Sequence, residues 1–384
     1  MKSPSAAVRG LDRSGIREVF DLANTIPGAI HLEMGEPDFA TPAHVCEAAA
    51  QAAIDGYTKY TPNAGLPALR EALAEKIVTR NGLDAGAERI LVTPGAIASL
   101  FAAFLALCDK GDQVLIPDPA WPNYRMIAAL QGLEVVRYPL RVEDGFLPSA
   151  ELIEPLVSDG TKLILVNSPS NPTGVVTRGS HLEDLMALVS DKDLWVVSDE
   201  VYDEIYFDGP VAPSIASAGD PERVVTVWSL SKTYAMTGWR VGYALAPGEL
   251  APLMIKTQEP ITACVNAPAQ MGALAAVSGP QDCVVEMREA YRRRRDSTLG
   301  QLDSSGISYV TPAGAFYLWI DISDSGNDST DFARALLLDQ GVAVTPGQAF
   351  GPAGRGYVRV SLATDPGLLH EGVARLIEAL RAAR

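Results

Sequence analysis

The stretch VVTVWSLSKTYAMTGWRVG, residues 224–242, contains an apolar β-branched segment, a short polar connection and the start of a second apolar segment. β-Branched residues favour extended backbone, so we expect a strand on each side of the connection. Within the connection, Lys232 lies close to the hydroxyls of Ser229 and Ser231, and Arg240 follows eight residues later. Two interpretations fit this pattern: an amine that lies beside a bound phosphate, or a surface lysine after a buried strand.

Further β-branched runs precede this stretch, and helical patterns such as 98–107 and 181–189 occupy the gaps between them. Nearly continuous apolar strands that alternate with helices indicate a mostly parallel sheet with helices on both faces. The sequence therefore predicts an α/β fold. The candidate strands are Ile90–Val92, Gln113–Ile116, Val135–Tyr138, Leu163–Val166, Trp195–Val197, Val224–Val227 and Val241–Leu245.

The pattern changes after about residue 250. A long helical stretch at 283–302 is followed by the apolar strand candidate 316–320 and a helix at 331–339. Two short strand candidates, 342–344 and 358–360, precede a terminal helix. This order is typical of a smaller α+β domain.

The composition is that of a soluble globular protein with room for two domains: 384 residues, 47% hydrophobic and 20% charged. The net charge of −16 repels nucleic acid and anionic membranes, so we expect neither as a partner. The basic run Arg292–Arg295 continues a helical pattern. It predicts a solvated helix face, with an anion site as the alternative.

Neither cysteine nor histidine occurs at the spacing of a metal site, and no Cys-x-x-Cys pair is present. We therefore expect no metal, no disulfide framework and a reducing, cytoplasmic setting. The first residues lack the apolar segment of a signal peptide, and no run approaches eighteen apolar residues. The residues concerned are Cys46, Cys108, Cys264, Cys283, His31, His44, His181 and His370.

Three polar clusters follow candidate strands, at residues 92–96, 167–174 and 198–202. Ligands of open parallel sheets bind beyond the carboxyl ends of the strands, so we expect these clusters to meet at one site. The first cluster offers backbone amides to an anion, and the second places Asn171 on a proline-stiffened turn. In the third, Asp199 and Tyr202 are three residues apart, which is close enough to serve one ligand.

Four motifs lie in order along the chain: G-E-P-D-F at 35–39, N-P-T-G at 171–174, S-D-E-x-Y at 198–202 and S-x-S-K-x-x-x-M-x-G-W-R-x-G at 229–242. Together they resemble the class I aminotransferases that depend on pyridoxal 5'-phosphate (PLP), and within them the bacterial aspartate-aminotransferase-like branch. The resemblance runs from Gly35 to Arg359. It implies the fold type I architecture: a large domain at 46–275 with a mostly parallel seven-stranded sheet, and a small domain at 1–45 and 276–384.

The resemblance also implies roles around the cofactor ring. Lys232 is similar to the lysine that forms the Schiff base and then moves a proton between Cα and C4' of the cofactor. Asp199 resembles the carboxylate that keeps the pyridine nitrogen protonated. Asn171 and Tyr202 would bind the 3'-oxygen, and Trp121 would stack on the ring, with a plain core tryptophan as the alternative.

For the cofactor phosphate, the resemblance points to Arg240, whose planar fork suits bidentate contact with a dianion. Ser229, Ser231 and the turn at Gly95, Ala96 and Ile97 would complete this phosphate site. Tyr60 resembles a tyrosine that reaches the phosphate of a neighbouring subunit; a simple loop aromatic is the alternative. The resemblance thus implies a homodimer with shared active sites.

For the substrate, Arg359 resembles the arginine that binds the α-carboxylate, helped by Trp121 and Asn171. Gly35 would let the backbone approach the same carboxylate. The chain departs from dicarboxylate-specific relatives at Ile97, which stands where some of them have a lysine. Because a carboxylate buried without a cation is costly, we expect a neutral or aromatic amino donor, unless Arg17 supplies the missing charge.

The predicted function is transfer of the α-amino group of an L-amino acid to a 2-oxo acid, 2-oxoglutarate or pyruvate, through the Lys232 Schiff base. A PLP-dependent carbon-sulfur β-lyase would use the same residues and is the alternative enzyme class. A non-catalytic PLP sensor is a third hypothesis, disfavoured because the chain has no basic DNA-binding segment.

Overall fold

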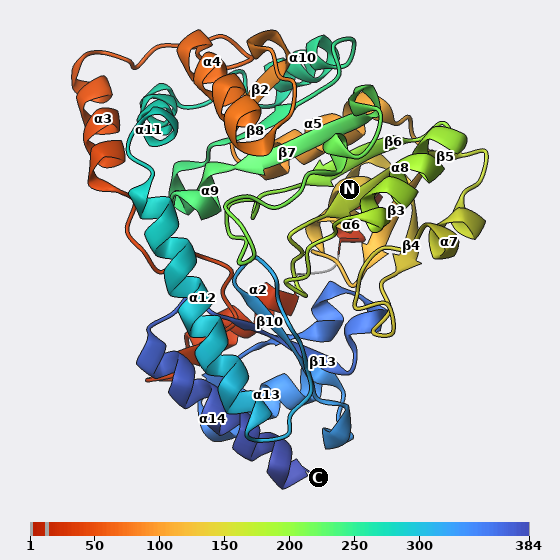
Figure 1. The fold of residues 1–384 in the computed structure, drawn as a ribbon, viewed down its shortest axis with the longest axis vertical. Helices are drawn as coiled ribbons and strands as arrows, with labels where there is room; N and C mark the ends of the chain where they lie inside the picture. The colour runs from red at the N-terminus through yellow and green to blue at the C-terminus, as the bar shows by residue number, and fades with distance from the viewer. Residues whose placement is uncertain (1–2, 12–14, 384) are drawn as a thin grey trace.

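The computed structural model describes residues 3–11 and 15–383. Its larger part is built on a seven-stranded sheet with the order β2-β8-β7-β6-β5-β3-β4 (Figure 1). Only β8 is antiparallel to its neighbours, so the predicted mostly parallel sheet is confirmed. The strands are β2 (Ile90–Thr93), β3 (Gln113–Asp118), β4 (Glu134–Pro139), β5 (Thr161–Asn167), β6 (Trp195–Asp199), β7 (Val224–Ser229) and β8 (Gly242–Leu245).

Helices cover both faces of this sheet, which explains why its strands are apolar without interruption. On β5, Ile164 and Val166 pack into one core with α4, α8 and α11, whereas Leu163 and Leu165 pack into another with α5, α6 and α10. The helices of this part are α3 (Ala43–Ile54), α4 (Pro67–Lys76), α5 (Ala96–Leu107), α6 (Asn123–Gln131), α7 (Ala150–Ile153), α8 (Ser180–Asp191), α9 (Leu230–Thr233), α10 (Ala251–Ile261) and α11 (Ala267–Ser278).

The smaller part has a four-stranded antiparallel sheet, β12-β13-β10-β9, with α13 and α14 packed on it (Figure 1). The long α12 runs from the helices of the larger part down to this sheet (Figure 1). The predicted α+β character is confirmed. The elements are α12 (Asp282–Asp303), β9 (Tyr309–Val310), β10 (Tyr317–Asp321), α13 (Ser329–Gln340), β11 (Val342–Ala343), β12 (Thr345–Pro346), β13 (Tyr357–Ser361) and α14 (Pro366–Ala383).

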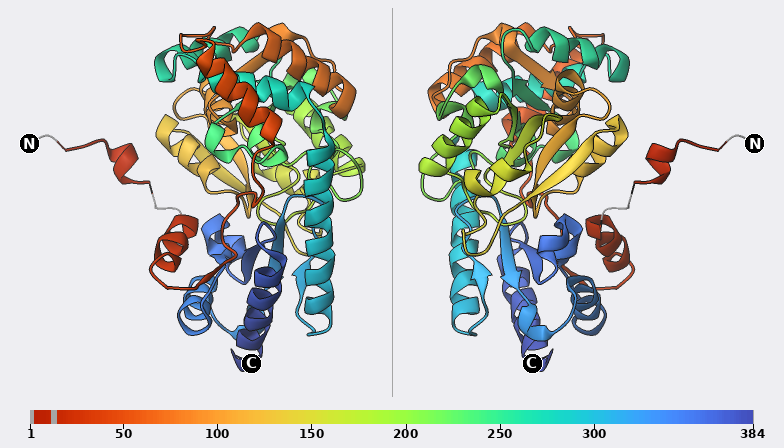
Figure 2. Two further views of the ribbon diagram at one scale, coloured as in Figure 1. Left: turned by 90° about the vertical axis from the view of Figure 1, so that its left-hand side faces the viewer. Right: turned by 90° about the vertical axis from the view of Figure 1, so that its right-hand side faces the viewer.

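The N-terminal segment joins the smaller part. Strand β1 (Ile30–His31) pairs in parallel with β11, and α2 (Gly15–Ala23) packs through Ala23 on the same region. Figure 2 shows α1 (Ala6–Arg9) projecting from the rest of the molecule. The predicted boundaries at 45/46 and 275/276 remain predictions, and residues 1, 2, 12–14 and 384 of the predicted small domain lie outside the described residues.

The run of four arginines lies on α12, and it is not a purely solvated face. Arg294 makes a bidentate contact with Asp38, with both distances 2.8 Å, and Arg295 stacks over the ring of Phe207 at 4.5 Å. Arg292 pairs with a glutamate one turn earlier. The periodicity indicated the helix correctly, but the partners of two of the arginines come from distant segments.

None of the helices within residues 3–11 and 15–383 combines the length and the apolar character needed to cross a membrane.

Candidate active site

A cavity of about 450 Å³ lies at the carboxyl ends of the parallel strands, between the two parts of the chain. Asn167, Asp199 and Ser229, which line it, are the last residues of β5, β6 and β7. The cavity brings together most of the residues singled out in the sequence. These are Gly35, Ala96, Ile97, Trp121, Asn171, Asp199, Tyr202, Ser229, Ser231, Lys232, Arg240 and Arg359, joined by Arg17.

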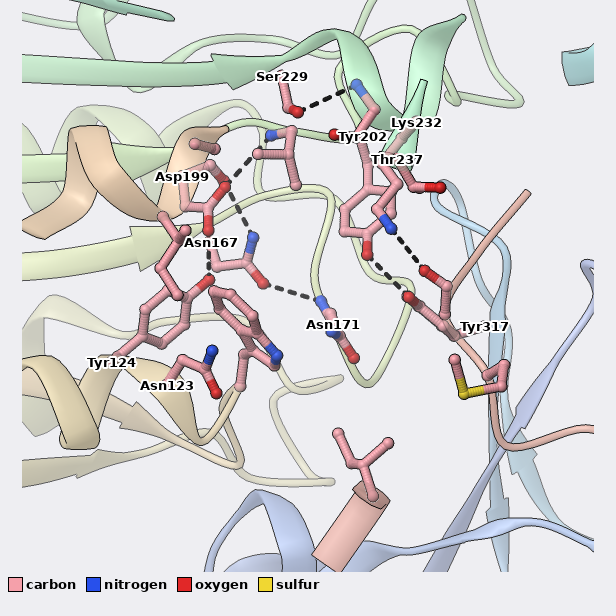
Figure 3. Close-up of a pocket in the computed structure, with 18 of the residues that line it drawn as sticks. Asn123, Tyr124, Asn167, Asn171, Asp199, Tyr202, Ser229, Lys232, Thr237 and Tyr317 are labelled. Carbon is pink, nitrogen blue, oxygen red and sulfur yellow. Dashed lines mark hydrogen bonds between the residues drawn. The ribbon is translucent and has the colours of Figure 1, made fainter. Parts of the chain in front are cut away.

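Lys232 lies on the one-turn helix α9 directly after β7. Its amine donates a hydrogen bond to the backbone carbonyl of Gly35 (Figure 3). Burial lowers the pKa of this amine to about 8, and the positive charges of Arg359 and Arg240 act in the same direction. Lys232 is therefore partly unprotonated near neutral pH, as a nucleophilic amine must be.

Gly35 is adapted to its position by the lack of a side chain. A Cβ atom there would lie 2.3 Å from the hydroxyl oxygen of Tyr317. The backbone of the G-E-P-D-F motif can approach both Lys232 and Tyr317 only because residue 35 is glycine.

Asp199 is 2% exposed at the end of β6. Its Oδ2 accepts a 2.6 Å hydrogen bond from the phenol of Tyr124, and its Oδ1 accepts one from the backbone of Val201 at 3.3 Å. Burial raises the pKa of Asp199 to about 6, against the opposing effect of these hydrogen bonds. A cation bound beside this carboxylate would stabilise its charged form.

Amide and phenol contacts extend along the cavity from Asp199 (Figure 3). The side chain of Asn167 accepts a 2.8 Å hydrogen bond from the backbone of Asn171 and donates one to the backbone carbonyl of Asp199 at 3.0 Å. The hydroxyls of Tyr202 and Tyr317 lie 2.8 Å apart. Polar groups from both parts of the chain are thus aligned along the cavity.

Arg359 projects from β13 and is 1% exposed. Its guanidinium donates to the side-chain oxygen of Asn171 at 2.9 Å, to the hydroxyl of Thr345 at 3.2 Å and to the carbonyl of Glu33. It also stacks over the ring of Tyr317 at 4.2 Å. Burial lowers the pKa of Arg359, but a guanidinium stays charged, so the cavity contains a fixed cation.

The turn into α5 is shaped around Arg240. Gly95 has φ +83°, and a Cβ atom on it would lie 2.1 Å from a guanidinium nitrogen of Arg240. The N-cap residue of α5, Gly95, offers no side-chain cap among the described residues, and Ala96 and Ile97 line the cavity. Uncapped amides at a helix N-terminus beside an arginine suit an anion. Helix α5 begins at Ala96, two residues before the predicted start, because Gly95 can adopt the positive φ that precedes it.

Ser229 and Ser231 lie on the same side of the cavity as this turn. The Ser229 hydroxyl accepts a hydrogen bond from the Ser231 amide at 3.1 Å and so begins α9. Both serines are buried and border the cavity.

The remaining wall is largely apolar. Ile97, Trp121 and residues of α2 line it, and the Trp121 ring makes an edge contact with Tyr124, with centroids 5.5 Å apart. Arg17 of α2 also borders the cavity and lies over the ring of Phe20 at 5.5 Å. This wall can accommodate an apolar substrate side chain, and Arg17 can pair with an acidic one.

Two predicted site residues do not line this cavity: Gly95, which lies directly before Ala96, and Tyr60. The side chain of Tyr60 is 90% exposed in the loop after α3. Within the described chain it therefore has no role at the site.

Sequence reasoning missed Tyr124, Asn167 and Tyr317 as site residues. Asn167 directly follows the predicted strand Leu163–Val166 and begins the polar cluster 167–174, which was a usable signal. Tyr124 and Tyr317 gave none, because an aromatic residue on a helix or a buried strand is usually core.

Comparisons with known proteins agree with this geometry. Residues 27–376 match the family described as aminotransferase class I and II. An aspartate aminotransferase of Pyrococcus abyssi is 40% identical over 372 residues, 96% of each chain. The aromatic-amino-acid aminotransferase 2 of Thermococcus litoralis is 38% identical over the same length and coverage. The aspartate aminotransferase from Thermus thermophilus with maleate aligns with a TM-score of 0.94 at 38% identity, over 99% of this chain and 100% of that one.

The fold and the family match place this chain among the aminotransferase class I and II proteins, a PLP-dependent family to which it belongs. It is an aminotransferase of the aspartate-aminotransferase-like kind, with similarity to aspartate and aromatic-amino-acid enzymes over nearly its whole length.

Proposed function

We propose that this cavity binds PLP and transfers the α-amino group of an L-amino acid to 2-oxoglutarate or pyruvate. The observation that carries the proposal is a pair of unbalanced charges in one cavity. Among the described residues, neither the partly buried amine of Lys232 nor the buried carboxylate of Asp199 makes an ion pair, and the two charges influence each other only at longer range. A ligand with an aldehyde and a protonated ring nitrogen answers both needs.

The anion site at the other end of the cavity fits the phosphate of the same ligand. Arg240, the amides of Ala96 and Ile97, and the hydroxyls of Ser229 and Ser231 would bind it. Asn171 and Tyr202 would bind the 3'-oxygen, and Trp121 would cover the ring. When bound, PLP supplies an electron sink for the negative charge that forms at the substrate Cα.

The chain's own residues supply the rest of the chemistry. Lys232, once free of the cofactor, would carry the proton to and from the substrate Cα. Asp199 would keep a proton at the ring nitrogen. Arg359 would orient the substrate through its α-carboxylate, and Gly35 lets the backbone approach that carboxylate.

We propose neutral and aromatic amino acids as the preferred donors, because the wall at Ile97 and Trp121 is apolar. Arg17 is the candidate cation for acidic substrates. Arg17→Ala should lower kcat/KM for glutamate about tenfold or more and leave that for phenylalanine nearly unchanged. Arg381→Ala, an exposed change on α14, is the matched control.

The exposed Tyr60 supports a dimeric assembly in which it reaches the phosphate of the neighbouring subunit. Tyr60→Phe should weaken PLP binding, whereas Tyr57→Phe, a substitution in the same loop, should not. If sedimentation shows a monomer and titration shows that this monomer binds PLP with undiminished affinity, the assembly is contradicted.

The decisive experiment compares the enzyme with Lys232→Ala in a screen of amino donors against both 2-oxo acids. We expect ping-pong turnover by the enzyme and none by the variant, which should still bind PLP through the phosphate site. Near-normal turnover by Lys232→Ala would refute the assignment. Release of ammonia and pyruvate from a cysteine conjugate without a 2-oxo acid would instead identify a β-lyase.

A further inference from the structure

Glu33 has a fully buried side-chain carboxylate, and its backbone carbonyl contacts Arg359. Its side chain is 0% exposed. Its backbone carbonyl accepts hydrogen bonds from the guanidinium of Arg359 and, at 3.1 Å, from the hydroxyl of Thr345. Glu33 does not line the cavity, so its carboxylate is not exposed to substrate.

The carboxylate of Glu33 is incompletely paired. One oxygen accepts from Nδ1 of His31 at 2.8 Å, and the other, Oε2, has no hydrogen-bond partner in the described part of the chain. His31 is itself 37% exposed and lies near the ring of Phe20, with centroids 6.3 Å apart. A carboxylate buried in this way requires a positive charge close by.

Arg359 is a buried cation that has no anionic hydrogen-bond partner among the described residues. Within residues 3–11 and 15–383 its hydrogen bonds go only to neutral oxygens, those of Asn171, Thr345 and the Glu33 carbonyl. Burial lowers the pKa of Arg359, and Glu33 is among the groups that act in the opposite direction. The negative charge of Glu33 and the positive charge of Arg359 therefore offset one another, although the carboxylate and the guanidinium make no direct contact.

We propose that Glu33 is the resident counter-charge of Arg359 and limits how tightly the site binds the substrate carboxylate. The inference rests on the proposed role of Arg359. Without substrate, Glu33 offsets the buried guanidinium. When a substrate carboxylate arrives, Arg359 is shared between two anions whose mutual repulsion weakens the complex. Product, which carries the same carboxylate, leaves more readily for the same reason.

The test is the binding of 3-phenylpropanoate, an unreactive carboxylate, to the holoenzyme by calorimetry. Glu33→Gln keeps the shape and removes the charge. We expect the dissociation constant of 3-phenylpropanoate to fall by about tenfold or somewhat more, as for charges roughly 10 Å apart at an effective dielectric constant of about 20. The neutral 3-phenylpropanamide should bind both proteins equally. Glu378→Gln, an exposed change on α14, controls for net charge.

The expected direction separates this role from a structural one, because loss of structure weakens binding. Equal or weaker binding of 3-phenylpropanoate by Glu33→Gln overturns the proposal. If that variant does not fold, His31→Lys decides, since a lysine at this partly exposed position offsets the same carboxylate and should also tighten binding. Arg359→Gln tests the underlying function: if it leaves binding unchanged, the role of Arg359 is wrong as well. Weaker binding by Arg359→Gln without tighter binding by Glu33→Gln removes this inference alone.

Discussion

The phenol of Tyr124 donates a 2.6 Å hydrogen bond to Oδ2 of Asp199, and both side chains are buried. Burial raises the pKa of Asp199 to about 6, and this hydrogen bond acts against that effect. Tyr124, from the first turn of α6, thereby keeps the acid at the end of β6 in its charged form. A residue that gave no sequence signal thus supports one of the most strongly predicted site residues.

Tyr124→Phe is expected to weaken PLP binding about tenfold. The loss of one hydrogen bond to a charged group corresponds to about 1.5 kcal/mol, and the variant's Asp199 is protonated over a wider pH range. Titration of cofactor-free protein with PLP measures the change. Tyr138→Phe is the control, since it removes a 2.8 Å hydrogen bond to the carbonyl of Leu165 away from the acid. Equal affinities of the wild type and Tyr124→Phe would show that Asp199 does not depend on Tyr124.

Gly95→Ala should disrupt the phosphate site. The backbone there has φ +83°, and the added methyl would lie 2.1 Å from the guanidinium of Arg240. We expect at least about a tenfold loss of PLP affinity and a loss of about 1–2 kcal/mol in stability. Gly238→Ala is the matched control, because a Cβ at that position meets nothing within 4 Å. The idea fails if both variants bind PLP as the wild type does.

Covalent capture of PLP by the cofactor-free protein should depend on pH with a midpoint near 8. Burial lowers the pKa of Lys232 to about 8, and only the neutral amine attacks an aldehyde. The initial rate of capture, trapped with borohydride, should therefore rise from pH 6 to 9 and then level off. A rate that is still rising steeply at pH 10 would indicate an ordinary lysine. Lys232→Arg, which lacks the amine, gives the background level of borohydride-trapped PLP at other lysines.

The buried carboxyl of Glu200 should make the protein less stable as the pH rises from about 5 to about 8. Its carboxyl accepts hydrogen bonds from Ser214 at 2.7 Å and Ser198 at 2.8 Å, and burial raises its pKa to about 8 from an ordinary 4.5. The folded state therefore binds more protons than the unfolded state between these values, so stability falls as pH rises through this window.

Glu200→Gln should remove that slope. Relative to the wild type it should gain on the order of a few kcal/mol between pH 5 and pH 8, since one pKa unit corresponds to about 1.4 kcal/mol. Chemical unfolding of the cofactor-free protein at pH 6.5, 7.5 and 8.5 measures the difference. The exposed Glu378→Gln should show no such trend. If the free energy of unfolding varies with pH in the same way for Glu200→Gln and the wild type, the Glu200 carboxyl is not protonated in the folded state.

The local pattern of the chain was enough to predict the seven strands, the mostly parallel sheet and the edge at which the site lies. Apolar runs specify which segments are buried, and in a parallel sheet the carboxyl ends of the strands meet at one edge. Asp199, Lys232 and Asn171 lie at the ends of strands or within a few residues after them, so their convergence could be expected from sequence. Tyr60 is a different case: the resemblance assigned it to the phosphate site of a neighbouring subunit, and this stays a prediction, because within one chain the side chain is exposed.

Contacts between segments far apart in the chain could be seen only in the folded molecule. The Tyr202–Tyr317 hydrogen bond spans 115 residues, and the Arg359–Asn171 hydrogen bond spans 188. Sequence motifs encode backbone conformation and burial over a few turns, which is why they indicate the residue types at a site. The packing of the two sheets decides which buried charges lie near one another, as Glu33 and Arg359 do. No local sequence pattern contains that information.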